Sequence, residues 1–171
     1  RSSTRRACLQ LKTTFPIMTH VKNFVLLACT LCVCSAPAAS RPPNIVFVLA
    51  DDLGYGDLAC FGHREIKTPN LDRLAASGLK LTHCYSAAPV CSPARAGIMT
   101  GRTPYRVGVY NAIPFLSPAH LRQSEITIAA LLKKSGYATA QVGKWHLNGM
   151  FNIPGQPPPN DNGFEQWFAG Q

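Results

Sequence analysis

One short run of residues combines a nucleophilic side chain with a nearby cation. It reads Cys91-Ser-Pro-Ala-Arg-Ala-Gly-Ile-Met-Thr-Gly101. Ser92 is suited to cap a helix and Pro93 to occupy its first position, so Cys91 is expected just before a helix N-terminus. Unpaired backbone N–H groups at such an end favour a bound anion, and Arg95 lies one turn further on. The same pattern is also compatible with a buried free cysteine or with half of a disulfide.

Two adjacent carboxylates follow a continuous apolar run of strand length. The run begins at Asn44 and stops at Asp51 and Asp52. It is typical of a strand buried on both faces, and ligands of an open α/β sheet gather at the carboxyl ends of its strands. Adjacent carboxylates repel each other unless a cation lies between them, and their hard oxygen atoms suit Ca²⁺ or Mg²⁺. The alternative is a solvated Asp-Asp turn followed by Gly54.

A lysine and a histidine follow a second predicted strand. The segment Gly136-Tyr-Ala-Thr-Ala-Gln-Val-Gly-Lys-Trp-His146 begins with a helix-terminating glycine and continues as a strand over 137–142. That strand places Lys144 and His146 at the carboxyl edge of the sheet, where ligands bind. At such a site a lysine provides positive charge and a histidine can transfer a proton. Taken alone, an exposed strand-end lysine and a histidine packed beside Trp145 are the simpler interpretation.

These three elements, in this order, resemble the sulfatase family. Cys91-x-Pro-x-Arg95 with Thr100-Gly101 resembles the first sulfatase signature, and Gly143-Lys-x-His146 resembles the second. The resemblance covers about Pro43 to Gln171 and looks closest to the arylsulfatase and N-acetylgalactosamine-6-sulfatase group. It implies an α/β fold with an alkaline-phosphatase-like doubly wound sheet. Alternating helices and strands along the chain agree with that class.

The resemblance also implies a modified residue and a metal. In sulfatases the cysteine at the position of Cys91 is oxidised to Cα-formylglycine by a formylglycine-generating enzyme, and the hydrate of this aldehyde attacks the sulfate ester. Asp51, Asp52 and the modified Cys91 are the implied metal ligands. The family resemblance favours Ca²⁺, with Mg²⁺ as the alternative.

Four residues carry the catalytic roles that the resemblance implies: Cys91, Arg95, Lys144 and His146. Cys91 provides the nucleophilic hydroxyl after modification, and Arg95 holds the hydrate. Lys144 contacts the hydrate and the sulfate oxygens, where it stabilises charge that develops as the ester breaks. His146 bonds the second hydroxyl and helps remove its proton when sulfate is expelled.

The predicted function is therefore that of a sulfuric ester hydrolase acting on sulfate monoesters, either a sulfated carbohydrate or an aryl sulfate. Two other classes stay open. A phosphodiesterase-type member of the alkaline phosphatase superfamily normally uses Ser or Thr as nucleophile, so Cys91 argues against it. A non-catalytic secreted binding protein would keep Cys91 as a thiol or in a disulfide.

The first 39 residues are expected to be absent from the mature protein. Residues 1–17 precede Met18 and are interpreted as an upstream extension. Residues 18–39 have the basic, apolar and Ala-x-Ala parts of a signal peptide, which predicts export to a secreted, lysosomal or periplasmic location. The apolar stretch is shorter than the roughly 20 residues of a stable membrane anchor.

Removal of this segment changes the charge and the cysteine count. It lowers the number of basic residues from 17 to 12, whereas all 8 acidic residues remain. The remaining basic residues are scattered along the chain, which argues against a nucleic-acid partner. Three of the 7 cysteines remain: Cys60, Cys84 and Cys91. An odd number leaves one thiol without an intramolecular partner, and we expect this to be Cys91. Cys60 and Cys84 are either free or paired with each other.

Local signals predict further elements between these motifs. They indicate a helix over 68–78 with Leu71 and Leu74 on its apolar face, a half-buried strand over 79–85, and a helix from a Ser124 cap to Lys134. Later metal and sulfate ligands of sulfatases have no counterpart before Gln171. We therefore expect residues 40–171 to be the N-terminal part of a truncated catalytic domain, inactive by itself.

Overall fold

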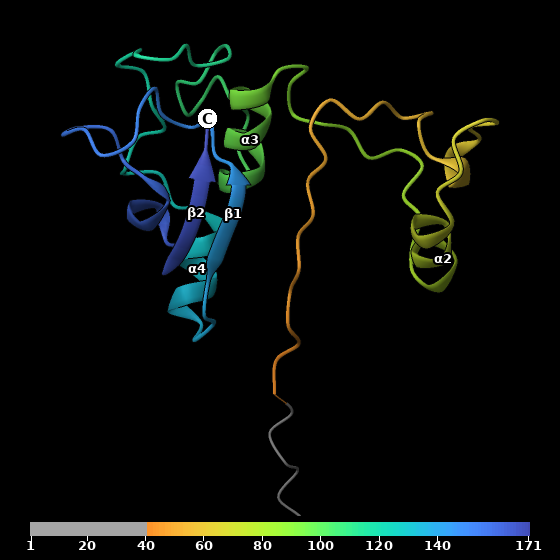
Figure 1. The fold of residues 1–171 in the computed structure, drawn as a ribbon. Helices are drawn as coiled ribbons and strands as arrows, with labels where there is room; N and C mark the ends of the chain where they lie inside the picture. The colour runs from red at the N-terminus through yellow and green to blue at the C-terminus, as the bar shows by residue number, and fades with distance from the viewer. Residues whose placement is uncertain (1–40) are drawn as a thin grey trace, which may run out of the picture. The chain divides into compact units, whose positions relative to one another are not determined.

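The computed structural model describes residues 41–171. The predicted extension (1–17) and signal peptide (18–39) lie outside the described residues. The chain divides into one unit that ends at Val48 and a second that begins at Leu49, and the second contains every named element. These are η1 (Ala59–Phe61), α2 (Pro69–Ser77), α3 (Cys91–Thr100), α4 (Ile128–Lys134), β1 (Ala140–Lys144), η2 (Pro159–Asn162) and β2 (Gln166–Gly170) (Figure 1).

The two strands form a parallel pair. Ala140 is opposite Gln166 and Lys144 is opposite Gly170, so β1 and β2 run side by side in the same direction (Figure 1). The backbone N–H of Trp145 donates to the carbonyl of Gly170 at 2.7 Å and extends the pairing past the end of β1. The predicted strand over 137–142 is thus shifted towards its C-terminus, because the ladder with β2 begins only at Ala140. A parallel pair connected through other elements is typical of the predicted α/β class.

Helix α3 begins two residues earlier than the sequence indicates. Val90 occupies the N-cap position and Cys91 is the first helical residue. The predicted cap at Ser92 is wrong, because its buried hydroxyl accepts a hydrogen bond from the backbone N–H of Ile113 at 3.0 Å instead. Ser92 therefore anchors the loop that follows the helix.

Helix α4 begins later than predicted. Thr127, not Ser124, is its cap: the Thr127 hydroxyl accepts from the N–H of Ala130 at 3.1 Å and donates to the carbonyl of Asn162 at 2.6 Å. Gly163 follows directly, and a Cβ atom there would lie 2.4 Å from the Ala130 nitrogen. This close approach requires glycine at position 163, which also has φ of 99°.

Two predicted strands are not formed. Residues 44–50 and 79–85 contain no assigned strand, although both ranges are described. The apolar side chains of the first range are exposed, with Val46 at 85% and Val48 at 86%. The structure records no ladder partner for either range, and a strand is stable only when its backbone groups are paired.

Helix α2 is found at Pro69–Ser77, as predicted, but its apolar face is not buried. Leu71 and Leu74 are exposed. Thr68 occupies the N-cap position, but its side chain makes no capping hydrogen bond. Its hydroxyl accepts from the N–H of Ala59 and donates to Asp72, which ties α2 to η1.

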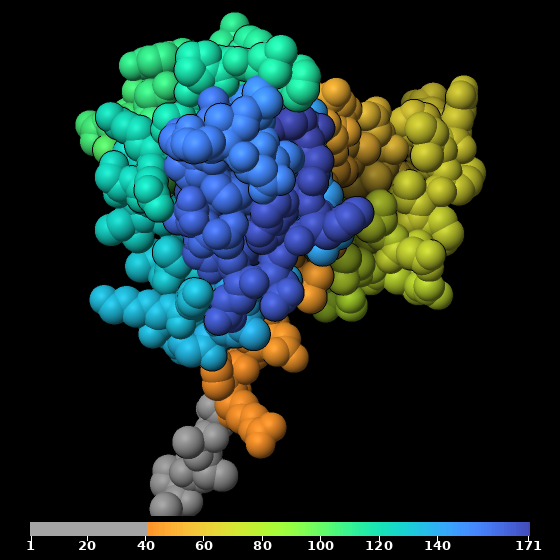
Figure 2. Space-filling model, turned by 60° about the vertical axis from the view of Figure 1, so that its left-hand side comes forward, coloured from red at the N-terminus to blue at the C-terminus, as the bar shows by residue number. Residues whose placement is uncertain are grey.

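The hydrophobic core lies where α3, the following loop and the end of β1 meet. Its buried members are Ala96, Val107, Val109, Ile113, Leu121, Trp145 and Leu147. Figure 2 shows the loop after α3 and the segment after β1 packed against each other in one continuous surface. Among the described residues, no helix is both long and apolar enough to cross a bilayer.

Candidate functional site

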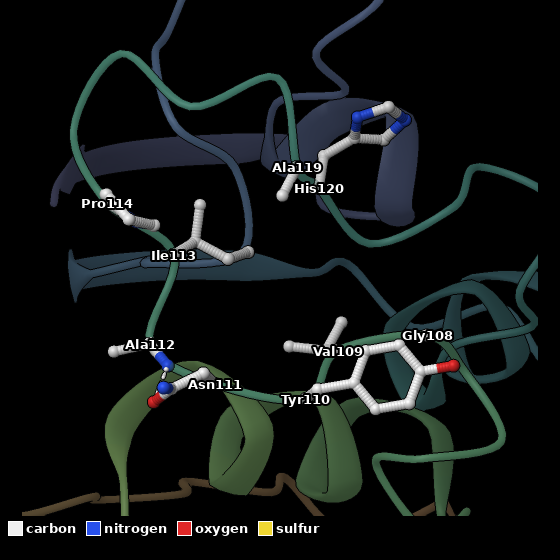
Figure 3. Close-up of a pocket in the computed structure, with 9 residues that line it drawn as sticks. All are labelled: Gly108, Val109, Tyr110, Asn111, Ala112, Ile113, Pro114, Ala119 and His120. Carbon is white, nitrogen blue, oxygen red and sulfur yellow. Dashed lines mark hydrogen bonds between the residues drawn. The ribbon is translucent and has the colours of Figure 1, made fainter.

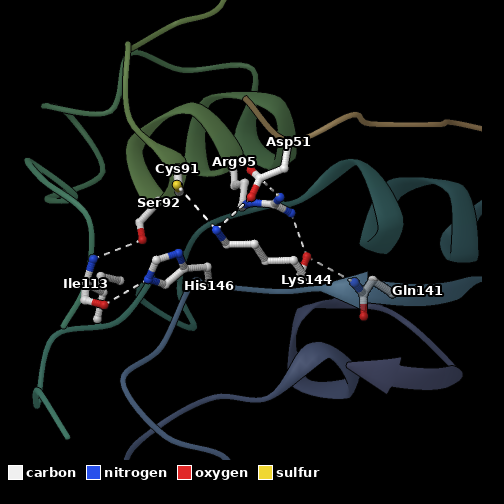
Figure 4. A network of polar contacts seen from close by, with 8 residues as sticks. All are labelled: Asp51, Cys91, Ser92, Arg95, Ile113, Gln141, Lys144 and His146. Atoms are coloured by element: carbon white, nitrogen blue, oxygen red, sulfur yellow. Dashed lines mark hydrogen bonds and ion pairs between the residues drawn. The ribbon is translucent and has the colours of Figure 1, made fainter. Parts of the chain in front are cut away.

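Side chains from three distant parts of the chain meet at the N-terminal end of α3 (Figure 4). Lys144, the last residue of β1, donates from Nζ to Asp51 Oδ2 at 2.8 Å and to Cys91 Sγ at 3.4 Å. Cys91 begins α3, and Asp51 lies in the loop that precedes η1. Lys144 therefore connects the predicted nucleophile with a predicted metal ligand.

Arg95 holds the same group of residues from the next turn of α3. Its Nη1 atom donates to the backbone carbonyl of Lys144 at 2.6 Å, and its Nη2 atom donates to Asp51 Oδ1 at 3.2 Å (Figure 4). Its side chain is only 12% exposed. A partly buried arginine that bridges a carboxylate and a strand-end carbonyl fixes α3 against β1.

A glutamine that sequence reasoning missed shares this carbonyl. The side-chain amide of Gln141 donates to the carbonyls of Gly143 and Lys144 at 3.2 and 3.4 Å. No local pattern predicts this contact, because an amide on a strand usually indicates a solvent-facing position.

Asp51 and Lys144 influence each other's protonation. The hydrogen bond from Lys144, followed by that from Arg95, holds the pKa of the Asp51 carboxyl below its ordinary value. The hydrogen bond to Asp51 raises the pKa of Lys144 above its ordinary value, against the opposing effect of desolvation. Both groups are consequently charged near neutral pH.

Asp51, Asp52 and Cys91 form a possible cation site. One ligand atom from each lies within 4.8 Å of the others. Asp52 has φ of 56°, an uncommon left-handed conformation that is easier for aspartate than for most residues. Two carboxylates suit a hard cation such as Ca²⁺ or Mg²⁺, whereas the sulfur of an unmodified cysteine does not. The donor set therefore fits the predicted metal best when position 91 presents oxygen.

His146 lies at the side of this group without bonding to it. Its Nε2 atom is 2.9 Å from the carbonyl of Ile113, which can only accept, so Nε2 carries the proton. Its Nδ1 atom is buried and has no partner among the described residues. In Figure 4 the ring lies between Ile113 and the end of the Lys144 side chain. Nδ1 is thus a free acceptor in the described part of the chain.

A cavity of about 200 Å³ is lined in part by Ile113 (Figure 3). It is mostly apolar, and the side chains of Val109, Ile113 and Ala119 point into it. Sequence reasoning did not identify this cavity, because it is formed between loop segments that have no secondary-structure pattern. Ile113 therefore belongs both to the wall of the cavity and to the hydrogen bond with His146.

A family model described as Sulfatase matches residues 43–171. The chain belongs to the sulfatase family. Mouse (Mus musculus) steryl-sulfatase is 48% identical over 142 residues, covering 77% of this chain and 22% of that protein. Arylsulfatase A of Homo sapiens is 50% identical over 113 residues (64% and 22%), and human N-acetylgalactosamine-6-sulfatase is 44% identical over 142 residues (78% and 26%). The chain thus spans about a quarter of the length of these sulfatases.

Solved structures support the same fold. The crystal structure of Ps i-CgsB has a TM-score of 0.69 at 38% identity and covers 75% of this chain and 28% of that protein. A Bacteroides thetaiotaomicron protein from the metabolism of multiple glycosaminoglycans has a TM-score of 0.68 at 35% identity, covering 76% and 28%. The predicted sulfatase resemblance and alkaline-phosphatase-like α/β class are confirmed.

The sulfatase chain brings most of its predicted site residues into one group. Asp51, Cys91, Arg95 and Lys144 are joined by direct contacts. Asp52 belongs to the group through its distance to Asp51 and Cys91. His146 is the exception, because its bond is to a backbone carbonyl. The catalytic or metal-binding roles of all six residues stay predictions. Among the described residues Cys60, Cys84 and Cys91 are free, so the structure contains no Cys60–Cys84 disulfide.

Proposed function

We propose that the complete protein hydrolyses sulfate monoesters through a residue derived from Cys91. The observation that carries this proposal is the contact of Lys144 Nζ with Cys91 Sγ at the start of α3. An anionic ester group next to Cys91 would meet the helix N-terminus and this lysine together. Arg95 contributes a second positive charge one turn along the helix.

The hydrate of Cα-formylglycine at position 91 would supply one hydroxyl that attacks sulfur, with its proton passing to the alcohol that leaves. Deprotonation of the second hydroxyl would then re-form the aldehyde as the bond from carbon to the sulfated oxygen breaks and sulfate departs. Lys144 binds the sulfate oxygens and stabilises their growing charge. His146 accepts a proton at Nδ1, because Nε2 is already committed to the carbonyl of Ile113. Arg95 keeps Lys144 in place through the carbonyl of that residue.

Asp51, Asp52 and position 91 hold the divalent cation in this proposal, which is Ca²⁺ or, alternatively, Mg²⁺. The cation neutralises the adjacent carboxylates and favours negative oxygen at position 91. Their close spacing supports this assignment.

We assign a sulfated carbohydrate as the substrate class, with aryl sulfates as further substrates. Named relatives include a steryl-sulfatase, an arylsulfatase and an N-acetylgalactosamine-6-sulfatase, so the family resemblance covers several leaving groups. The proposal also includes export through residues 18–39, to a secreted, lysosomal or periplasmic location. A formylglycine-generating enzyme must then meet the segment around Cys91 before the chain folds.

The deciding experiment is the mass of the tryptic peptide that contains Cys91. The full-length protein is made in a host that has a formylglycine-generating enzyme, and the peptide is compared with that from a host that lacks it. We expect the mass of an aldehyde in the first host and of a thiol in the second. A thiol or a disulfide in both hosts would instead favour a non-catalytic binding protein.

A further inference from the structure

The side chain of Gln156 ties together three loop segments around His146. Its Oε1 atom accepts from the backbone N–H groups of Gly149 and Met150 at 2.8 and 3.2 Å. Its Nε2 atom donates to the backbone carbonyl of Ser117 at 2.7 Å. One amide therefore connects the segment after β1 with the loop after α3.

The two segments that Gln156 joins, one containing Ser117 and the other Gly149, are also in direct backbone contact. The N–H of Leu116 donates to the carbonyl of Gly149 at 3.2 Å. A Cβ atom on Gly149 would lie 2.1 Å from the carbonyl oxygen of Ser117, so no other residue fits without displacement. The clamp of Gln156, Gly149 and Ser117 therefore leaves little freedom for either segment.

This clamp lies close to both ends of the hydrogen bond from His146 to Ile113. His146 precedes Gly149 by three residues, and Ile113 precedes Ser117 by four. His146 also has φ of 54°, a left-handed conformation that persists only where the surroundings hold it. The clamp and the His146–Ile113 bond thus close a ring of contacts across the two segments.

We propose that Gln156 is a positioning residue for His146. Its three hydrogen bonds hold the backbone on both sides of the imidazole, which keeps Nε2 donating to Ile113 and leaves Nδ1 free as an acceptor. The effect on catalysis rests on the proposed sulfatase function, whereas the effect on the geometry of His146 does not.

The kinetic test uses the full-length protein with 4-nitrophenyl sulfate as substrate. Gln156→Met removes all three hydrogen bonds at nearly constant size. We expect kcat to fall about tenfold or more while KM changes by less than about threefold, because misplacement of a catalytic group acts mainly in the transition state. Gln123→Met is the matched control, since Gln123 is exposed, and should leave both constants unchanged.

A double variant separates positioning from a loss of folded protein. In a His146→Ala background, Gln156→Met should lower kcat no further, because Gln156 acts through His146. An equal loss of activity in both backgrounds would overturn the proposal. If Gln156→Met does not fold, Gln156→Glu keeps the two acceptor contacts and loses only the donation to Ser117, and the same comparison is made with it.

A second measurement does not depend on activity. The Nε2–H signal of His146 is recorded by NMR in protein with ¹⁵N-labelled histidine and assigned with His146→Ala. Gln156→Met should shift or broaden this signal, and Gln123→Met should not. An unchanged signal would refute the positioning role even in an active enzyme, whereas an inactive unsubstituted protein would refute only the proposed sulfatase function.

Discussion

At the scale of single residues, Lys144 controls the charge balance of the site. It contacts Asp51 and Cys91 through the same ammonium group, and Arg95 contacts Asp51 from the other side. The carboxylate thus has two positive partners within hydrogen-bond distance. Because the first of these makes the largest contribution to the lowered pKa of Asp51, its removal has a measurable consequence.

Lys144→Met should raise the pKa of Asp51 towards its ordinary value, because the ionised carboxylate is no longer stabilised by a hydrogen bond from a charged lysine. The measurement is a titration of the Asp51 carboxyl carbon by NMR. Lys134→Met, at an exposed position, serves as the control and should leave the pKa of Asp51 unchanged. An Asp51 pKa that is the same with and without Lys144 would contradict the contact between these side chains.

The sign of the effect on stability follows from the direction of this shift. Because the pKa of Asp51 is lower in the folded protein, the ionised carboxylate stabilises the folded protein at pH values above the pKa that Asp51 has in the unfolded chain. This contribution is lost as the pH falls through the folded pKa. The contribution is small, since the carboxylate is partly exposed to water.

At the scale of elements, helix ends are set by contacts with distant segments. Thr127 caps α4 and at the same time donates to Asn162, 35 residues further along the chain. Ser124 has the right type for a cap, but Thr127 makes both bonds in a buried position. The start of α4 is therefore determined jointly by local capping and by the chain next to η2.

Thr127→Val should destabilise the folded chain by about 2 kcal/mol, because the cap is lost and the buried carbonyl of Asn162 loses its donor. Chemical denaturation followed by circular dichroism measures this change. Thr103→Val, at an exposed position, is the matched control and should have little effect. Equal stability of the two variants would show that the Thr127 hydroxyl makes no net contribution.

At the scale of the molecule, apolar side chains are exposed on one face of the β1–β2 pair. Val142 and Phe168 are opposite each other in the register and are 78% and 82% exposed. Adjacent exposed apolar side chains on a short sheet favour association with another surface. This part of the sulfatase chain should therefore self-associate when produced alone.

The 171-residue chain should form oligomers and bind a hydrophobic dye, and a Val142→Thr, Phe168→Thr double variant should reduce both effects. Size-exclusion chromatography with light scattering measures the association. Tyr85→Thr, which removes an exposed aromatic outside the sheet, is the control and should change neither property. A monomeric unsubstituted chain would contradict the expectation.

Sequence patterns determined the family, the α/β class and which residues meet at the start of α3. Asp51, Cys91, Arg95 and Lys144 were predicted to meet, and they do. This was possible because each belongs to a short motif whose residue types and spacing have a chemical reason. The existence of α2, α3 and α4 was also predicted. The local signals were the Ser-Pro start of α3, and the apolar spacing and terminating glycines of α2 and α4.

Only the tertiary structure decided the contacts between segments that lack such motifs. Ser92 binds Ile113 instead of capping α3, and Gln156 joins Ser117 to Gly149. The apolar run over 44–50 has strand character in sequence but no recorded ladder partner. The physical reason is common to these cases: a hydroxyl, an amide or a backbone group is satisfied by whichever partner the fold brings near, and spacing along the chain does not specify that partner.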